Sequence, residues 1–176
     1  ATLLYTSGTT GVPRGVLLSQ QNLVGNAWGV IEAFSPRQHD RRLNFLPLSH
    51  IFARTCDWYV TIVSGTQMGI ATNRESTLSD CRLFRPTVLN GVPYFFDKVR
   101  RLLLEQSPDP TAEELRNALG GEITLCNVGG APLPDYLFNF YQQRKVALRQ
   151  GYGLTEASPV VTLSTEDQFK RDSVGK

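Results

Sequence analysis

Short runs of apolar residues alternate along the chain with longer stretches in which apolar positions recur at helical spacing. The short runs predict strands over residues 3–5, 16–18, 43–46, 67–71, 88–90, 123–128, 147–150 and 160–163. The longer stretches predict helices over residues 20–34, 51–63, 78–84, 94–105, 112–119 and 136–143. Strands that alternate with helices predict an α/β fold, in which helices flank a parallel-rich sheet with right-handed crossovers.

Two of the predicted helices carry start signals. Ser19 stands where a cap is expected for the helix over 20–34, and Thr111 with Glu114 forms a capping box before the helix over 112–119. No internal repeat and no low-complexity linker divides the chain, so we expect one domain over residues 1–176. Ligands of open α/β sheets bind beyond the carboxyl ends of the strands, and the loops at those ends are the candidate binding segments.

The segment over residues 5–15, YTSGTTGVPRG, joins the first two predicted strands. It contains the hydroxyl residues Thr6, Ser7, Thr9 and Thr10, the glycines Gly8, Gly11 and Gly15, and the cation Arg14. Glycines let successive backbone N–H groups turn toward one point, hydroxyls add donors, and a guanidinium matches phosphate oxygens. The alternative is a flexible linker, but Pro13 and Arg14 interrupt the low complexity and favour a polyphosphate loop. A P-loop kinase or GTPase is not expected, because the segment lacks Gly-Lys-Ser/Thr.

Residues 151–156, GYGLTE, follow the predicted strand over 147–150. The ring of Tyr152, between two glycines, could stack on a nucleobase. Thr155 offers a hydroxyl to a phosphate, and Glu156 offers an oxygen ligand to Mg²⁺. The alternative is an ordinary turn with a half-buried tyrosine and a solvated glutamate.

Two further segments end predicted strands. In residues 128–134, VGGAPLP, the glycines Gly129 and Gly130 leave room for a flat ring against the backbone, although a plain strand-to-helix turn would look the same. In residues 45–52, FLPLSHIF, either Ser49 or His50 could simply cap the helix that follows.

The three glycine-containing segments, in their order along the chain, resemble the nucleotide-binding motifs of the AMP-forming adenylating enzymes, the acyl-CoA synthetase superfamily. The intervening stretches LPLSHIFARTCDWY, FRPTVLNGVPYFFDKV and SPVVTL look most like the long-chain fatty acyl-CoA synthetase branch. The chain departs from the family at Arg14, where lysine is usual; the charge is kept, but reach and donor geometry change. The resemblance implies the central part of the large N-terminal domain of such an enzyme.

The resemblance implies a role for each matched residue. Tyr152 would lie against adenine, Thr155 near the α-phosphate and Glu156 on the magnesium ion. His50 would belong to the acyl-carboxylate pocket, and with Thr155 and Glu156 it completes the expected catalytic set. The expected nucleotide-binding residues are Thr6, Ser7, Gly8, Thr9, Thr10, Gly11, Arg14, Gly15, Gly129, Gly130, Ala131, Pro132, Gly151, Tyr152, Gly153 and Thr155.

The implied activity is activation of a carboxylic acid by ATP and Mg²⁺, through an acyl-adenylate to the coenzyme A thioester. The branch resemblance makes the acid a long-chain fatty acid. Adenylation of an aryl or amino acid for a carrier protein, and a non-catalytic nucleotide-binding module, remain alternatives. The chain starts without methionine and ends soon after its last predicted strand, so we expect an excised, inactive piece of a longer enzyme, with the mobile C-terminal domain beyond Lys176.

Composition limits the classes of binding partner that we expect. A net charge of +2, without a basic and aromatic patch, gives no reason to expect nucleic acid. No run approaches the roughly 18 apolar residues of a membrane span. Three cysteines without C-x-x-C spacing and two histidines disfavour a disulfide framework or a metal cage. We therefore expect small-molecule substrates and a cytoplasmic protein without a signal peptide, and leave peripheral membrane contact and oligomeric state open.

Overall fold

The computed structural model describes residues 2–6, 12–165, 170 and 173–175. Its main element is a six-stranded sheet with the strand order β4-β3-β5-β6-β7-β8. The strands are β3 (Arg41–Asn44), β4 (Gln67–Ile70), β5 (Val88–Gly91), β6 (Leu125–Val128), β7 (Ala147–Gly153) and β8 (Val160–Leu163). Strands β3 to β7 pair in parallel, as the alternation of strands and helices predicts. The mixed α/β fold with a parallel-rich sheet is therefore confirmed.

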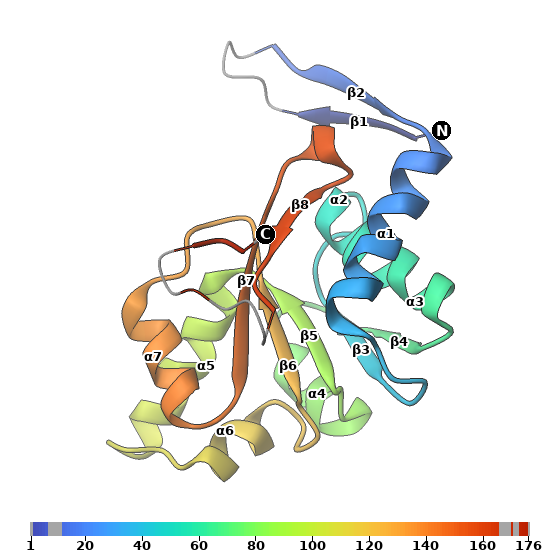
Figure 1. Cartoon of the computed structure of the whole chain (residues 1–176). Helices are drawn as coiled ribbons and strands as arrows, with labels where there is room; N and C mark the ends of the chain where they lie inside the picture. The colour runs from blue at the N-terminus through green and yellow to red at the C-terminus, as the bar shows by residue number, and fades with distance from the viewer. Residues whose placement is uncertain (1, 7–11, 166–169, 171–172, 176) are drawn as a thin grey trace.

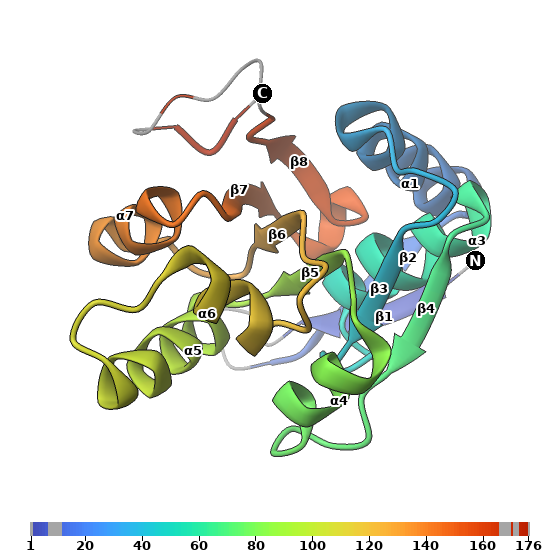
Figure 2. The same ribbon diagram turned by 90° about the horizontal axis from the view of Figure 1, so that it is seen from below.

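Helices cover both faces of this sheet. They are α1 (Gln20–Phe34), α2 (Ile51–Ala53), α3 (Val60–Ser64), α4 (Thr77–Phe84), α5 (Pro93–Gln106), α6 (Ala112–Ala118) and α7 (Asp135–Gln143), with a π-helical turn η1 (Arg54–Tyr59) and a 3₁₀ turn η2 (Thr155–Ala157). Helices α1 and α3 lie on one side of the sheet, and α5, α6 and α7 lie on the other (Figure 2). Among the described residues, no helix combines the length and the apolar character that crossing a bilayer requires.

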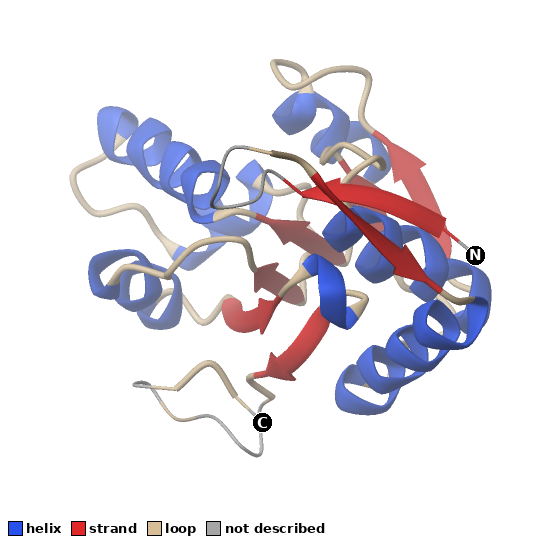
Figure 3. Cartoon of the chain, turned by 90° about the horizontal axis from the view of Figure 1, so that it is seen from above, coloured by secondary structure: helices blue, strands red, loops and turns tan. Residues whose placement is uncertain are grey.

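The first two predicted strands do not join the sheet. Strands β1 (Thr2–Thr6) and β2 (Arg14–Leu18) form a separate antiparallel hairpin, with Thr6 opposite Arg14. Only residues 7–13 link the two strands, and a parallel connection needs a dozen or more residues, so antiparallel pairing is the geometry that the short link allows. The hairpin lies across one end of the molecule, above the ends of β7 and β8 (Figures 1 and 3).

The last strand also departs from the parallel pattern. Strand β8 runs antiparallel to β7, because only the short segment from Leu154 to Pro159 connects them. Strand β7 continues through Gly153, three residues beyond its predicted end at residue 150, so Gly151–Gly153 form the end of a strand and not the turn that was the alternative. Pairing with β8 at Gly151 and Tyr152 extends the strand beyond the apolar run from which its end was predicted.

The predicted helix over 51–63 is interrupted. It consists of α2, the π-helical turn η1 and α3. The amide of Val60 donates to the carbonyls of Thr55 and Asp57, whereas a regular α-helix would place it on the carbonyl of Cys56. Hydrophobic spacing does not reveal one extra residue in a turn, and such π-helical turns are frequent at functional sites.

The helix starts follow their sequence signals. Ser19 and Asn22 form a capping box at α1, and Thr111 and Glu114 form one at α6. The amide and hydroxyl of Thr111 both donate to the Glu114 carboxylate, which lowers its pKa. The bounds predicted for α1 are reproduced, and those of the other elements shift by a few residues or less.

The two faces of the sheet differ in polarity. Toward α4, α5, α6 and α7, the strands present apolar side chains, among them Leu43, Leu89 and Val128, which belong to the largest core cluster. The alternate positions carry buried polar side chains, and these are Arg42, Asn44, Asn90 and Asn127. Because successive strand residues point to opposite faces, this polar set faces the side covered by α1 and η1.

Candidate functional site

One cavity of about 250 Å³ lies beyond the carboxyl ends of β5, β6 and β7. Residues from several separate segments line it: Val30, Phe34, His50, Ile51, Phe52, Cys56, Asn90, Asn127, Gly129, Gly130, Gly151, Tyr152, Gly153, Leu154, Thr155, Pro159, Val160 and Leu163. Seven of the expected site residues are among them: His50, Gly129, Gly130, Gly151, Tyr152, Gly153 and Thr155. The fold thus brings together three segments that lie far apart in the sequence.

Tyr152 stands at the edge of the cavity with half of its side chain exposed. Its two glycine neighbours are required by packing against β8. A Cβ on Gly151 would lie 2.9 Å from Leu163 Cδ2, and one on Gly153 would lie 2.3 Å from the carbonyl oxygen of Pro159. The Tyr152 ring is therefore an accessible aromatic face on a closely packed strand end.

The glycines after β6 line the cavity beside the neighbouring strand β7. A Cβ on Gly129 would lie 3.1 Å from Cζ of Phe52, so the ring of Phe52 occupies the space that a side chain there would need. Gly130 has a φ of 78°, a left-handed conformation that favours glycine. The other two residues expected in this segment, Ala131 and Pro132, are exposed and do not line the cavity.

His50 combines the two roles that its sequence position allows. Its Nδ1 accepts a hydrogen bond of 3.3 Å from the amide of Phe52, so it is the side-chain cap of α2. The side chain is also exposed and lines the cavity. The cap holds the imidazole where β3 gives way to α2, at the mouth of the cavity.

The turn η2 carries Thr155 and Glu156 and is fixed by two distant polar side chains. Asn26 of α1 donates to the carbonyls of Ala157 and Val160 and accepts from the amide of Val160. The buried Thr55 hydroxyl donates to the carbonyl of Ser158 over 3.0 Å. Sequence reasoning missed both positioning residues, because nothing in their own segments indicates a partner more than a hundred residues away.

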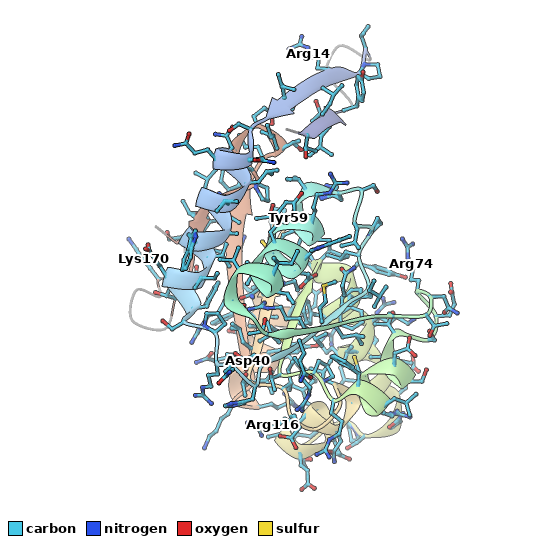
Figure 4. All side chains as sticks on the ribbon, turned by 90° about the vertical axis from the view of Figure 1, so that its right-hand side faces the viewer. Arg14, Asp40, Tyr59, Arg74, Arg116 and Lys170 are labelled. Atoms are coloured by element: carbon cyan, nitrogen blue, oxygen red, sulfur yellow. The ribbon has the colours of Figure 1, made fainter. Side chains whose placement is uncertain are left out.

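The hairpin brings the first motif to the same end of the molecule. Strand β2 lies beside η2, so Arg14 and the pair Thr155 and Glu156 belong to neighbouring elements. The Thr6 hydroxyl donates to the Arg14 carbonyl over 3.4 Å, and the exposed Arg14 stands on the hairpin away from the main body (Figure 4). Gly15 lies next to it, with Leu3 packed against its backbone. The expected phosphate-binding residues Ser7, Gly8, Thr9, Thr10 and Gly11 lie outside the described residues.

A buried polar network that the sequence did not reveal forms one wall of the cavity. The Asn90 amide nitrogen donates to the Cys56 carbonyl over 3.0 Å and to the Asp57 carboxylate. The Asn127 amide nitrogen in turn donates to Asn90 Oδ1 over 2.8 Å. Both asparagines line the cavity, whereas the Asp57 side chain lies behind them.

Burial perturbs the ionisable members of this network. Desolvation raises the pKa of Asp57 to about 7, and Arg42 and the hydrogen bond from Asn90 counteract the rise. The pKa of Arg42 is lowered because it is buried, against the attraction of Asp57. Burial also raises the pKa of the Cys56 thiol, so this cysteine at the cavity wall is not a nucleophile at neutral pH.

The arrangement fits a nucleotide better than a metal ion held by protein alone. Tyr152 offers an exposed aromatic face at the edge of a cavity that Gly129 and Gly130 also line. Within the part of the chain that the structure describes, no three His, Cys, Asp or Glu side chains gather as a metal site. The exposed Glu156 carboxylate could hold a divalent ion only together with ligands from a substrate such as a phosphate chain.

The sequence profile of the AMP-binding enzyme family matches residues 1–176, the whole chain. The chain belongs to the AMP-binding enzyme family. Among curated members, a long-chain-fatty-acid–CoA ligase, FadD15 of Mycobacterium bovis, is 32% identical and aligns with 100% of this chain and 36% of its own length. The human long-chain-fatty-acid–CoA ligase ACSBG2 is 27% identical over 100% of this chain and 33% of its own length. The chain thus spans about a third of the length of these relatives.

Solved structures of AMP-binding enzymes share the fold. An o-succinylbenzoate CoA synthetase variant from Bacillus subtilis superposes on 100% of this chain and 34% of its own with a TM-score of 0.82 and 25% identity. The N-terminal domain of FACL13 from Mycobacterium tuberculosis gives a TM-score of 0.78 and 23% identity, over 99% of this chain and 42% of its own. The similarity to N-terminal domains of adenylate-forming enzymes agrees with the predicted fold class.

Proposed function

We propose that this chain forms the nucleotide and acid site of an ATP-dependent acid–thiol ligase, which activates a carboxylic acid as an acyl-adenylate. The observation that carries the proposal is the single cavity lined by His50, Gly129 and Tyr152, which come from three separate segments. Membership of the AMP-binding enzyme family supports the nucleotide half of the proposal. Relatives that carry the names of CoA ligases support the transfer to a thiol.

In the proposed site, adenine stacks on Tyr152 and lies along the glycine-lined wall at Gly129 and Gly130. The Thr155 hydroxyl donates to the α-phosphate, at the end of the cavity closest to the hairpin. Arg14 on β2 balances charge on the β- and γ-phosphates, with donors from the adjoining hydroxyl-rich loop. A magnesium ion, held by Glu156 and the phosphates, would spread the charge that develops on pyrophosphate.

The chemistry then has two steps. A carboxylate oxygen attacks the α-phosphorus, the bond from that phosphorus to the bridging oxygen breaks, and pyrophosphate leaves with the electron pair. The thiol of coenzyme A, having lost its proton, then attacks the acyl carbonyl and AMP departs. His50, whose imidazole is held by the hydrogen bond from the Phe52 amide, orients the carboxylate beside the α-phosphate. Positioning of this kind accounts for much of the catalysis in transfer reactions between bound substrates.

For the acid, the names of the curated relatives support a long-chain fatty acid. A second candidate, an aryl acid, is supported by the o-succinylbenzoate CoA synthetase, which reaches a similar identity in the structural comparison. We assign the reaction to a longer protein of which this chain is a part, a proposal supported by the chain's alignment to about a third of its relatives' length. We predict that residues 1–176 alone bind ATP weakly and do not catalyse acyl-CoA synthesis. A cytoplasmic location also stays a prediction.

The test is carboxylate-dependent exchange between ATP and pyrophosphate, measured on the full-length protein with fatty, aryl and amino acids. Exchange with any acid class supports acid activation, and the class that gives the fastest exchange identifies the substrate. A protein that binds ATP but gives no exchange with any acid would contradict the proposal and favour a non-catalytic nucleotide-binding module. A matched Glu156→Gln variant should lose exchange while keeping its fold, because Glu156 is exposed.

A further inference from the structure

The hydrogen bonds in the polar wall of the cavity run in one direction, from Asn127 to Asn90 and from Asn90 to the Cys56 carbonyl, and the π-helical turn sets that direction. In an α-helix the Cys56 carbonyl would accept from the Val60 amide, but in η1 that amide donates to Thr55 and Asp57 instead. The Cys56 carbonyl is left to accept from Asn90. Because a backbone carbonyl can only accept, the Asn90 amide nitrogen must face it.

The same logic passes along the sheet to Asn127. With its nitrogen on Cys56, Asn90 presents its oxygen to the neighbouring strand, where Asn127 is its partner in register. That oxygen needs a donor, so Asn127 supplies its amide nitrogen over 2.8 Å. The remaining group of Asn127 is its carbonyl oxygen, a hydrogen-bond acceptor.

This acceptor is unused within the described part of the chain. Oδ1 of Asn127 is buried and has no hydrogen-bond partner there, although Asn127 lines the cavity and only 9% of its surface is exposed. A buried acceptor without a donor costs free energy, and native proteins rarely leave one. A ligand that carries an N–H or O–H group to this wall would satisfy it.

We propose that Asn127 selects acids that carry a hydrogen-bond donor, a hydroxyl or amino group, at the end remote from the activated carboxylate. This inference rests on the acid activation proposed above and refines its substrate. Asn127 lies two residues before Gly129, deeper in the sheet, on the side that Phe52 and Cys56 cover. Tyr152 lies on the neighbouring strand β7, three residues beyond the register partner of Asn127, and His50 is exposed, so the far end of the acid points toward Asn127 while the nucleotide stays at the strand ends.

The walls around Asn127 suit the rest of such an acid. Val30, Phe34 and Phe52 supply apolar surface, as a hydrocarbon or aryl body requires. At about 250 Å³ the cavity is at the small end of ligand pockets, so one polar group at its base has a large share of the recognition. An unsubstituted acid of the same length would leave Asn127 unpaired.

The experiment is pyrophosphate exchange on the full-length protein with matched acids. Benzoate is compared with para-hydroxybenzoate and para-aminobenzoate, and medium-chain fatty acids with their terminal hydroxyl derivatives. We expect the donor-bearing acid to be preferred in kcat/KM by at least about tenfold, since a site built for a donor rejects the analogue that lacks it. Asn127→Leu should bring the ratio to one or below, and Asn127→Ala provides a smaller change if the leucine variant does not fold.

Asn139→Leu is the matched control, because Asn139 is exposed on α7 and should leave the ratio unchanged. A wild-type protein that prefers the unsubstituted acids overturns this inference and leaves acid activation intact. An Asn127→Ala variant that raises KM for ATP and keeps the acid ratio also overturns it, because the acceptor would then serve the nucleotide. Absence of exchange with every acid overturns both proposals.

Discussion

Phe52 packs against Gly129. From this contact we predict that one methyl group added at residue 129 lowers both the stability of the fold and the activity of the site. Alanine at 129 would place Cβ 3.1 Å from Cζ of Phe52 and 3.4 Å from both ring ε-carbons. Ordinary carbon contacts are about 3.5–4.0 Å, so the ring must retreat by a few tenths of an ångström. Phe52 also lines the cavity, and its retreat changes the wall that faces the acid.

Overpacking of this kind costs about 1–3 kcal/mol in a well-packed core. If the strain appears when the acid must fit, the same energy corresponds to about a 5- to 150-fold loss in kcat/KM for the acid. We expect Gly129→Ala to lower the melting temperature by a few degrees and to lower kcat/KM for the acid within that range. KM for ATP should rise as well, because the proposed adenine site runs along Gly129 and Gly130.

Gly25→Ala is the matched control. Gly25 lies in α1, and a Cβ there would meet no heavy atom within 4 Å. This variant should gain about 0.5–1 kcal/mol in unfolding free energy, because glycine is a poor helix former, and should keep its exchange rate. Thermal unfolding and pyrophosphate exchange on both full-length variants test the pair. A Gly129→Ala protein that behaves like Gly25→Ala in both assays would refute the contact argument.

Three further predictions concern the charge and stacking groups. Tyr152→Ala should raise KM for ATP about 5- to 150-fold, because stacking on a base is worth about 1–3 kcal/mol, and Tyr152→Phe should not. Arg14→Ala should slow pyrophosphate formation about 10- to 150-fold and Arg14→Lys should restore most of the rate; an unchanged rate in Arg14→Ala removes this residue from the mechanism. Asp57 holds its proton in the fold up to about pH 7 and in the unfolded chain only to about pH 4, so its contribution to stability is present below pH 4 and is lost as the pH rises to 7, at up to about 1.4 kcal/mol per pH unit. Urea unfolding over this range should show a flatter profile for Asp57→Asn, and an unchanged slope would contradict the raised pKa.

Local signals predicted the elements whose causes are local. Ser19 and the capping box at Thr111 mark helix starts that the structure reproduces, and the alternation of strands with helices predicts the parallel order from β3 to β7. The two strands of the hairpin were predicted as strands, but not as a separate antiparallel pair, because strand composition does not indicate which strand is the partner. The same lack of partner information ended the predicted strand at residue 150, whereas β7 runs through Gly153.

The residues of the candidate site likewise fall into those that local motifs predict and those whose role depends on distant partners. His50, Gly129 and Tyr152 could be named from motifs, and the cavity that unites them is a product of the parallel sheet. Asn90 and Asn127 could not, because each reads as a polar interruption of an apolar strand. Their meaning depends on the register that pairs them and on a π-helical turn that frees a carbonyl thirty-four residues away.

The buried network also has a thermodynamic consequence for the interpretation of the cavity. Burying ionisable groups such as Arg42 and Asp57 away from water costs free energy, and apolar residues of similar volume are often as stable or more so. Both side chains keep an unpaired polar atom, Nε of Arg42 and Oδ2 of Asp57, in the described part of the chain. Packing therefore gives no reason for a polar interior on this face of the sheet, while the opposite face is apolar. A wall that must hold Asn127 in one orientation does give a reason, since Asp57 and the Cys56 carbonyl together fix Asn90 and, through it, the acceptor proposed to bind the acid.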